Sequence, residues 1–227
     1  MLTDIPNPVI HTPTNCLVVG PTHSGKTTFI RKLLENRHTV FKDGEGRVPN
    51  QIHYLYGSQW QPVFTEMQQE LPITFIQGFP KDVESKLDTH GEPGIVVIED
   101  MHSLLETSQE AFDFATKKTH HMGKATIIVL HSLFGRERLR NLRENSEVLF
   151  LFGFRNETSR INLFLGRYET GQRREALCKW YNKVTESVGD YICINTSLRV
   201  EDSRLRYTTN FIGVEAEGKA LRFFQLP

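Results

Sequence analysis

A glycine-rich octapeptide near the start of the chain carries the residues best suited to bind phosphate. Its sequence, GPTHSGKT over residues 20–27, matches the pattern G-x-x-x-x-G-K-[ST] at every fixed position. In this pattern backbone N–H groups face the phosphates, Lys26 reaches the β- and γ-phosphates, and the Thr27 hydroxyl ligates Mg²⁺. The residues expected to hold a nucleotide are Gly20, Pro21, Thr22, His23, Ser24, Gly25, Lys26, Thr27 and Thr28.

Two acids, Glu99 and Asp100, directly follow the apolar run Ile95–Ile98, which is typical of a parallel strand buried on both faces. In an open α/β sheet, ligands bind at the carboxyl ends of the strands. A P-loop nucleotidase needs an acid there to hold Mg²⁺, and usually a second acid to activate the attacking water. We expect Glu99 and Asp100, with Thr27, to form the metal site, and the order of the acids leaves open which one activates water. The alternative interpretation is the solvated acidic start of a helix.

Further polar residues follow a second apolar run, at residues 125–130. In P-loop ATPases with a strand inserted beside the acid-bearing strand, the residue at this position senses the γ-phosphate, which makes His131 a candidate sensor; the alternative is a histidine that merely caps a strand end near solvent. Four arginines come next, at positions 136, 138, 140 and 143. They form either a solvated helix face or a source of the arginine that stabilises charge on a transferring phosphoryl group.

Strands alternating with helices must position these residues. Short apolar or alternating runs predict strands at residues 16–19, 51–56, 72–76, 95–98, 125–130 and 148–152. Helical spacing predicts helices over 27–36, about 64–71 and from 104 to about 118. This alternation predicts an α/β fold with a mostly parallel central sheet. Together with the glycine-rich motif, it resembles the P-loop NTPase three-layer sandwich of the RecA-like (ASCE) type. The last third of the chain begins with a helical stripe from Leu177 to Val188, which is followed by a predicted strand at 191–194. We expect extra C-terminal edge strands at 205–209 and 221–224.

The chain organisation and composition set the broad class. We expect residues 1–14 to be an extended N-terminal arm, and residues 15–227 to be a single P-loop ATPase domain with a C-terminal extension from about residue 170, because no linker-like stretch interrupts it. Lys plus Arg number 27 and Asp plus Glu number 27, so composition does not by itself indicate a nucleic-acid binder. Three distant cysteines suit a reducing compartment. The longest apolar run, Val148–Phe154, is too short to span a bilayer, and we expect a soluble intracellular protein without membrane contact.

Nearly the whole chain, from about Pro8 to Ile212, resembles the FtsK/HerA-type genome-packaging ATPases of DNA viruses and virus-like transposons, of the poxvirus and polinton/adintovirus type. The phosphate-binding pattern alone is generic, so the resemblance depends on the order of several later segments. The segments are LVVGPTHSGKTTFIRKLL, IHYLYGSQWQPVF, IVVIEDMHSLL, HHMGKATIIVLHSLF, RNLRENSEVLFLFGFRNETSRINLFLGR and GDYICINTSLRVEDSRLRYTTNFI.

The resemblance implies a Mg²⁺-dependent ATPase that forms a homo-oligomeric ring and couples ATP hydrolysis to moving double-stranded DNA into a viral capsid. It places Arg140 where the family carries its arginine finger, which acts on the neighbouring subunit's nucleotide. The expected catalytic residues are then Lys26, Glu99, Asp100, His131 and Arg140. The implied location is the host cell, in the nucleus or cytoplasm, or the virion. The family usually has Gln-Asn at the sensor and Asp-Asp or Asp-Glu as its acids, whereas this chain has His131-Ser132 and Glu99-Asp100.

Two other classes share parts of this pattern. A P-loop nucleotide kinase-type phosphotransferase would use the arginines at 136–143 in its lid, and it would transfer phosphate to a nucleoside monophosphate instead of responding to DNA. A GTPase switch is suggested superficially by Asn182-Lys183-Val184-Thr185, but Thr185 stands where the guanine-binding aspartate is required.

Overall fold

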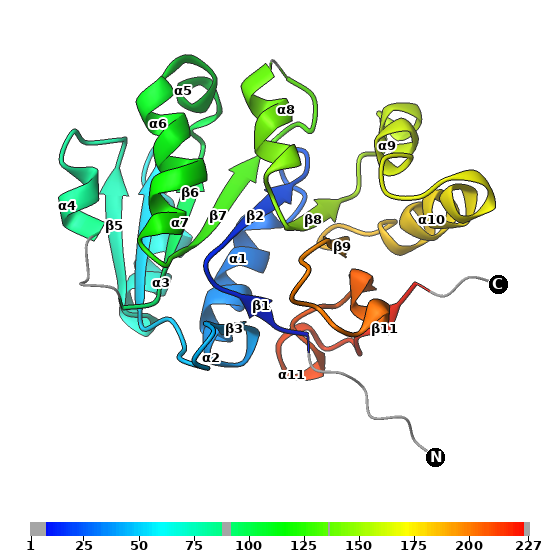
Figure 1. Ribbon diagram of the computed structural model, residues 1–227, viewed down its shortest axis with the longest axis horizontal. Helices are drawn as coiled ribbons and strands as arrows, with labels where there is room; N and C mark the ends of the chain where they lie inside the picture. Colours follow the sequence, from blue (N-terminus) through cyan, green and yellow to red (C-terminus); the bar gives the residue numbers. More distant parts are fainter. Residues whose placement is uncertain (1–7, 88–91, 136, 225–227) are drawn as a thin grey trace.

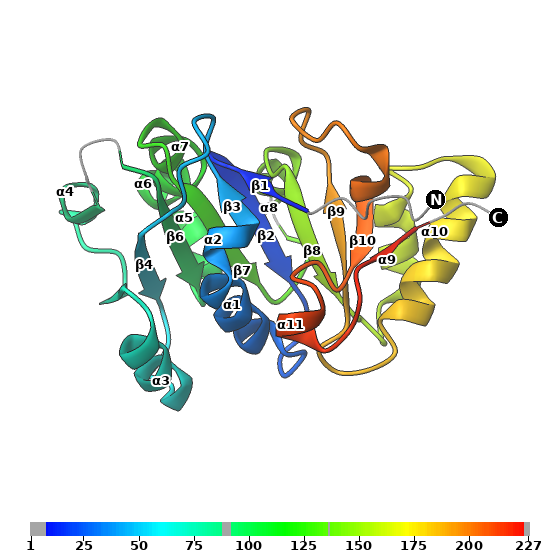
Figure 2. The same cartoon turned by 90° about the horizontal axis from the view of Figure 1, so that it is seen from below.

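The computed structural model describes residues 8–87, 92–135 and 137–224, and within them nine strands form one sheet in the order β11-β10-β9-β8-β2-β7-β6-β4-β5 (Figures 1 and 2). The parallel strands are β2 (Thr14–Val19), β4 (Gln51–Tyr56), β5 (Ile73–Gln77), β6 (Gly94–Glu99), β7 (Ala125–Leu130) and β8 (Val148–Phe152). The antiparallel strands are β9 (Tyr191–Asn195), β10 (Tyr207–Thr209) and β11 (Arg222–Phe223). The predicted α/β fold with C-terminal edge strands is confirmed.

The strand order brings the glycine-rich segment and the predicted acid pair, Glu99 and Asp100, to the same edge of the sheet. Strand β7 lies between β2 and β6, with Val18 opposite Val129 on one side and Val97 opposite Ile127 on the other. All three strands are buried along their whole length, which explains why they read as continuous apolar runs instead of alternating ones. Because β2, β6 and β7 are parallel, the residues that follow them emerge together.

Helices cover both faces of the sheet, so the domain has three layers (Figure 1). One face carries α1 (Lys26–Glu35), α2 (Arg37–Val40) and α3 (Pro62–Glu70). The other carries α4 (Val83–Leu87), α5 (His102–Thr107), α6 (Gln109–Asp113), the π-helical segment η1 (Phe114–Lys118), α7 (Thr119–His121), α8 (Glu137–Glu144), α9 (Thr158–Leu165) and α10 (Gly171–Val184). The short elements near the C-terminus are the 3-10 turn η2 (Ser203–Arg206) and α11 (Val214–Glu217).

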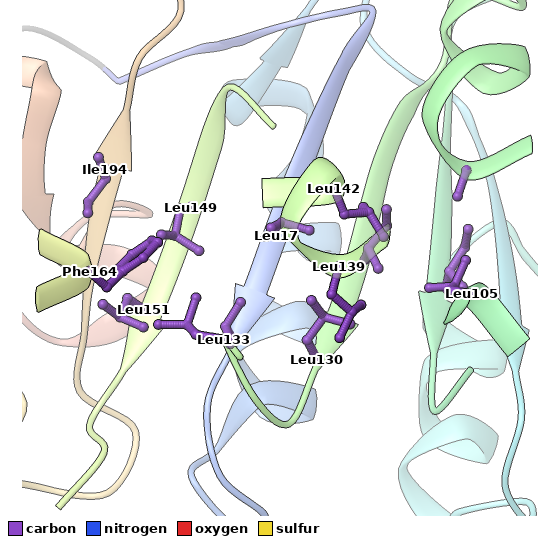
Figure 3. Close-up of a cluster of buried hydrophobic side chains, with 14 of the residues drawn as sticks. Leu17, Leu105, Leu130, Leu133, Leu139, Leu142, Leu149, Leu151, Phe164 and Ile194 are labelled. Atoms are coloured by element: carbon purple, nitrogen blue, oxygen red, sulfur yellow. The ribbon is translucent and has the colours of Figure 1, made fainter. Parts of the chain in front are cut away.

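Two apolar clusters fill the spaces between these layers. Figure 3 shows part of the first, where Leu17 of β2 and Leu130 of β7 lie under Leu139 and Leu142 of α8. In the second cluster the ring of Phe29, from α1, lies 4.8 Å from that of Phe150 and 4.6 Å from that of Tyr191. Burial of each large apolar side chain stabilises the fold by about 1.5–3 kcal/mol, so both clusters fix helices against the strands that position the site.

The structure differs from the sequence-based expectation in a few elements. The helix predicted from residue 104 to about 118 is divided into α5, α6 and η1. Helix α10 ends at Val184, so Val188, which extends the helical stripe in the sequence, lies beyond it and is exposed. Part of the predicted N-terminal arm pairs as β1 (Ile10–His11) with β3 (Phe41–Lys42), while residues 1–7 lie outside the described part. Among the described residues, no helix has the length and apolar character needed to cross a membrane.

Candidate functional site

The glycine-rich segment forms a tight loop between β2 and α1, at the carboxyl edge of the sheet. Gly25 has a φ of 94°, a left-handed conformation that a side chain disfavours, and a Cβ there would lie 3.1 Å from the Cα of Gly189. A Cβ on Gly20 would lie 2.6 Å from the Cβ of Phe152. The two fixed glycines of the pattern are therefore required by backbone conformation and by close packing.

Lys26 begins α1 and its ammonium group stays within the loop. The Nζ atom donates hydrogen bonds of 2.8 Å to the carbonyls of both Gly20 and Pro21, and it lies 3.4 Å from Nδ1 of His131. Burial lowers the pKa of Lys26, and the nearby carboxylates of Glu99 and Asp100 oppose that shift. The buried cation therefore lies among loop carbonyls and acids, where a phosphate group would be an additional anionic partner.

Glu99, the last residue of β6, is held by two hydroxyl donors. Thr27 Oγ1 donates to Glu99 Oε1 at 3.0 Å, and the buried hydroxyl of Tyr54 donates to Glu99 Oε2. Burial raises the pKa of Glu99, whereas the hydrogen bonds from Tyr54 and Thr27 favour its ionised form. The same burial, together with the Glu99 charge, raises the pKa of Tyr54. The structure thus brings the acid and the threonine of the predicted metal site into contact.

Asp100 follows in a left-handed backbone conformation, with a φ of 56°. Its Oδ1 atom lies 2.8 Å from Nε2 of His131, the residue after β7. Burial raises the pKa of Asp100, but hydrogen bonds from His131 and Ser58 outweigh it and leave the pKa below the usual value. His131 therefore bridges Lys26 and Asp100, while Thr27 contacts Glu99. Five of the predicted site residues thus form two hydrogen-bonded groups, which adjoin because Lys26 precedes Thr27 and Glu99 precedes Asp100 in the chain.

A cavity of about 460 Å³ opens beside these groups, and sequence reasoning did not identify its outer wall. It is lined by Pro21, Thr22, His23, Ser24, His131, Gly153, Phe154, Arg155, Asn156, Glu157, Thr185, Ser187, Val188 and Asp190. The amide of Gly189 donates to the Ser24 carbonyl at 3.1 Å, which ties the loop before β9 to the glycine-rich loop. Arg155 reaches the Glu186 carbonyl at 2.6 Å and joins the two segments of the outer wall.

The predicted arginines on α8 do not line this cavity. Arg138 donates to the Glu106 carbonyl at 2.9 Å, and Arg143 donates to the Leu133 carbonyl. Arg140 instead points outward, with 63% of its side chain exposed and an ion pair of 3.0 Å to Glu144. Arg136 lies outside the described residues. Within one chain, therefore, Arg140 is not brought to the cavity that His131 and residues 21–24 line.

Comparison with known proteins identifies the fold. No family model and no curated protein sequence matches the chain. The DNA-packaging ATPase B204 from Sulfolobus turreted icosahedral virus superposes with a TM-score of 0.53 at 12% identity, over 84% of this chain and 94% of that one. This chain has a P-loop NTPase fold. A further match is the genome-packaging NTPase B204 from Sulfolobus turreted icosahedral virus 2 in complex with AMP, with a TM-score of 0.49 at 12% identity, over 83% of this chain and 97% of that one. Another is the N-terminal domain of zonular occludens toxin from Neisseria meningitidis, with a TM-score of 0.41 at 15% identity, over 63% of this chain and 78% of that one.

Within the P-loop NTPase fold, the residues that sequence reasoning missed are those whose position depends on the strand order. Tyr54 reaches Glu99 because β4 lies next to β6, with Tyr54 and Val97 in register. The segment 185–190 reaches the glycine-rich loop because β9 returns antiparallel beside β8. Neither position carries a motif, although Gly189, with a φ of 91°, is a local turn signal in the sequence.

Proposed function

We propose that this chain is a subunit of an ATP-hydrolysing, FtsK/HerA-type motor that forms a homo-oligomeric ring and moves double-stranded DNA into a viral capsid. The observation that carries the hydrolytic part is that two hydrogen-bonded groups, Lys26–His131–Asp100 and Thr27–Glu99, adjoin at one sheet edge. The motor part is supported by the ordered sequence resemblance and by the likeness in fold to a DNA-packaging ATPase.

The residues present fit a nucleoside triphosphate and Mg²⁺. The cavity has the size and polarity of a nucleotide site, and the Ser24 hydroxyl within it is buried without a hydrogen-bond partner among the described residues. Residues 20–28 would hold the phosphates through backbone N–H groups and Lys26. Thr27 and Glu99 offer the hydroxyl and carboxylate oxygens that Mg²⁺ prefers. When bound, Mg²⁺ neutralises charge on the transferring phosphoryl group.

The contacts favour a division of labour between the two acids. Glu99 contacts Thr27 with one oxygen and Tyr54 with the other, so it is held on the metal side of the site. Asp100 contacts His131, which itself lines the cavity. Hydrogen bonding keeps the pKa of Asp100 low, so it is an ionised acceptor at neutral pH. We therefore assign the attacking water to Asp100 and the metal to Glu99.

His131 and Arg140 complete the proposed ATP-hydrolysing site. His131 lies between the Lys26 ammonium and the Asp100 carboxylate, the position from which it would respond to the γ-phosphate. Arg140 faces away from its own cavity, as expected for a residue that stabilises charge on a neighbouring subunit's nucleotide. A site completed by a neighbour requires assembly, which accords with a ring.

The decisive experiment measures ATP hydrolysis with and without duplex DNA. We expect the wild type to be stimulated by DNA and Lys26→Ala to lose hydrolysis, by at least about a hundredfold, because the site loses the charge that binds the β- and γ-phosphates. Lys183→Ala, an exposed lysine in α10, is the control and should hydrolyse ATP normally. Wild-type turnover by Lys26→Ala would refute the site. Phosphate transfer to a nucleoside monophosphate, with no response to DNA, would favour the kinase.

A further inference from the structure

One carboxylate oxygen of Glu144, on the surface of α8, accepts hydrogen bonds from two arginines, one in the same helix and one 23 residues further along the chain. Glu144 Oε1 lies 3.0 Å from Nε of Arg140 and 2.8 Å from Nη2 of Arg167. Arg167 follows α9, and its backbone amide donates to the Phe164 carbonyl at 3.0 Å, which fixes the backbone from which the Arg167 side chain extends. The two guanidinium groups therefore lie side by side, and 63% and 41% of their side chains are exposed.

A third arginine, Arg143, adds positive charge to the surface beside Glu144. A cavity of about 480 Å³ is lined by Gly135, Glu137, Arg140, Asn141, Arg143 and Glu144. Burial and the neighbouring charge of Arg167 lower the pKa of Arg143, whose Nε atom is buried and has no hydrogen-bond partner among the described residues. Arg140 and Arg167 share the Glu144 carboxylate, and the half-buried Arg143 lies beside them. Three guanidinium groups thus face two carboxylates, Glu137 and Glu144, which leaves a net positive charge here.

Helix stability accounts for only one of the two contacts of Glu144, because the pair with Arg140 is an i,i+4 pair within α8 whereas Arg167 lies outside that helix. Glu144 is the last residue of α8, where a negative charge opposes the helix dipole. The hydrogen bonds from Arg140 and Arg167 lower the pKa of Glu144, so its role is that of an ionised partner for them. Exposed ion pairs of this kind are weak, and a more highly charged anion would readily replace the carboxylate.

We infer that Arg167 acts together with Arg140 on the polyphosphate bound by a neighbouring copy of this chain, and that Glu144 is the counter-ion that holds both arginines until that polyphosphate is in reach. The inference rests on the proposed function, since it needs a nucleotide in a neighbouring subunit. A triphosphate offers several anionic oxygens, and two guanidinium groups can each bind it in bidentate fashion. Glu144 is on this account a positioning residue, whereas Arg167 contacts the reacting nucleotide.

The test compares Arg167→Ala with Arg173→Ala in steady-state ATP hydrolysis. Arg173 is a matched control, because it is also exposed and also forms an ion pair, with Glu169, but it lies on α10. We expect Arg167→Ala to lower kcat at least about tenfold with little change in KM, since a group acting mainly in the transition state affects kcat. Mixing Arg167→Ala with Lys26→Ala subunits should restore activity, because the second variant supplies an intact Arg167. Normal kcat, or no restoration on mixing, would overturn the inference.

Glu144 is tested separately. Glu144→Gln frees the arginines and should raise kcat/KM by up to about fivefold at low salt, because an exposed ion pair is worth up to about that factor. Glu144→Asp should behave like the wild type. A tenfold loss in Glu144→Gln would contradict the counter-ion role. If Lys26→Ala loses hydrolysis as expected while Arg167→Ala is normal, only the present inference fails. If the wild type does not hydrolyse ATP, the proposed function fails first.

Discussion

Glu99 is a buried, negatively charged side chain, and the two hydroxyl groups that donate to it offset only part of the free-energy cost of removing its charge from water. Burial raises the pKa of Glu99 above that of an exposed glutamate, even though Tyr54 and Thr27 donate to its two oxygens. A buried carboxylate of this kind suits metal binding better than it suits the stability of the nucleotide-free chain.

Neutralising Glu99 should therefore stabilise the nucleotide-free protein while abolishing hydrolysis. Because the folded-state pKa is raised, the folded chain binds a proton more readily than the unfolded chain, and stability is lost as pH rises from about 4.3 through the folded pKa. Glu99→Gln removes that loss, and we expect the Tm to rise by about 2–4 °C at neutral pH, the shift that corresponds to about 1 kcal/mol. The difference should vanish near pH 4. Thermal unfolding at both pH values measures it, with the exposed Glu175→Gln as control. An unchanged Tm at neutral pH would show that the hydrogen bonds fully offset the burial of the Glu99 charge, and a lower Tm would show that Glu99 stabilises the apo fold.

At the scale of elements, the ends of β4 and β6 approach too closely for a side chain between them. A Cβ on Gly57 would lie 2.2 Å from the carbonyl oxygen of Asp100, a backbone atom that cannot rotate away. The amide of Gly57 also donates to the Glu99 carbonyl at 2.9 Å. The turn after β4 thus supports the left-handed conformation of Asp100.

Gly57→Ala should displace Asp100 without disturbing the glycine-rich loop. We expect hydrolysis to fall at least about tenfold, because a shift of about 1 Å in a reacting group can cost a hundredfold. Nucleotide affinity should change less than about threefold. Gly44→Ala is the matched control, since a Cβ at Gly44 would meet nothing within 4 Å. Equal activity of the two variants would show that the position of Asp100 does not limit hydrolysis.

The bounds of individual strands and helices show how far the sequence predicts this structure. Strands at 51–56, 125–130 and 148–152 have the predicted bounds, because each apolar run is confined by polar or turn residues. The helix predicted from 104 to 118 is interrupted because Ser108 caps α6 by accepting from the Ala111 amide, a local bond that periodicity does not reveal. The five site residues that adjoin at the sheet edge are predicted by the glycine-rich motif and by the polar residues after two apolar runs. Tyr54 and the wall at 185–190 depend instead on which strands are neighbours, which no local pattern encodes.

At the scale of the whole molecule, the C-terminal strands are continuous with the sheet that carries the site. Helix α1 packs on both parts, since Phe29 contacts the rings of Phe150 and Tyr191. The chain has two tryptophans, and they report on opposite ends of this sheet. Trp60 lies beyond β4 against Phe75, and Trp180 lies on α10 against Phe224.

We expect one cooperative unfolding transition for the whole domain. Trp60→Phe and Trp180→Phe leave one reporter each, and their urea midpoints, followed by fluorescence, should coincide because both ends share one packed sheet. Far-UV circular dichroism on each variant controls for changes in overall stability. An earlier transition reported by Trp180 would show that the extension from about residue 170 unfolds as a separate unit.

Strand β8 is paired on both sides, by β2 in parallel and by β9 in antiparallel orientation. Its sequence, VLFLF, has no charge, proline or glycine, so β9 is what keeps this edge from pairing with other chains. Shortening the protein at residue 170 would therefore yield an aggregating fragment instead of a minimal nucleotide-binding core.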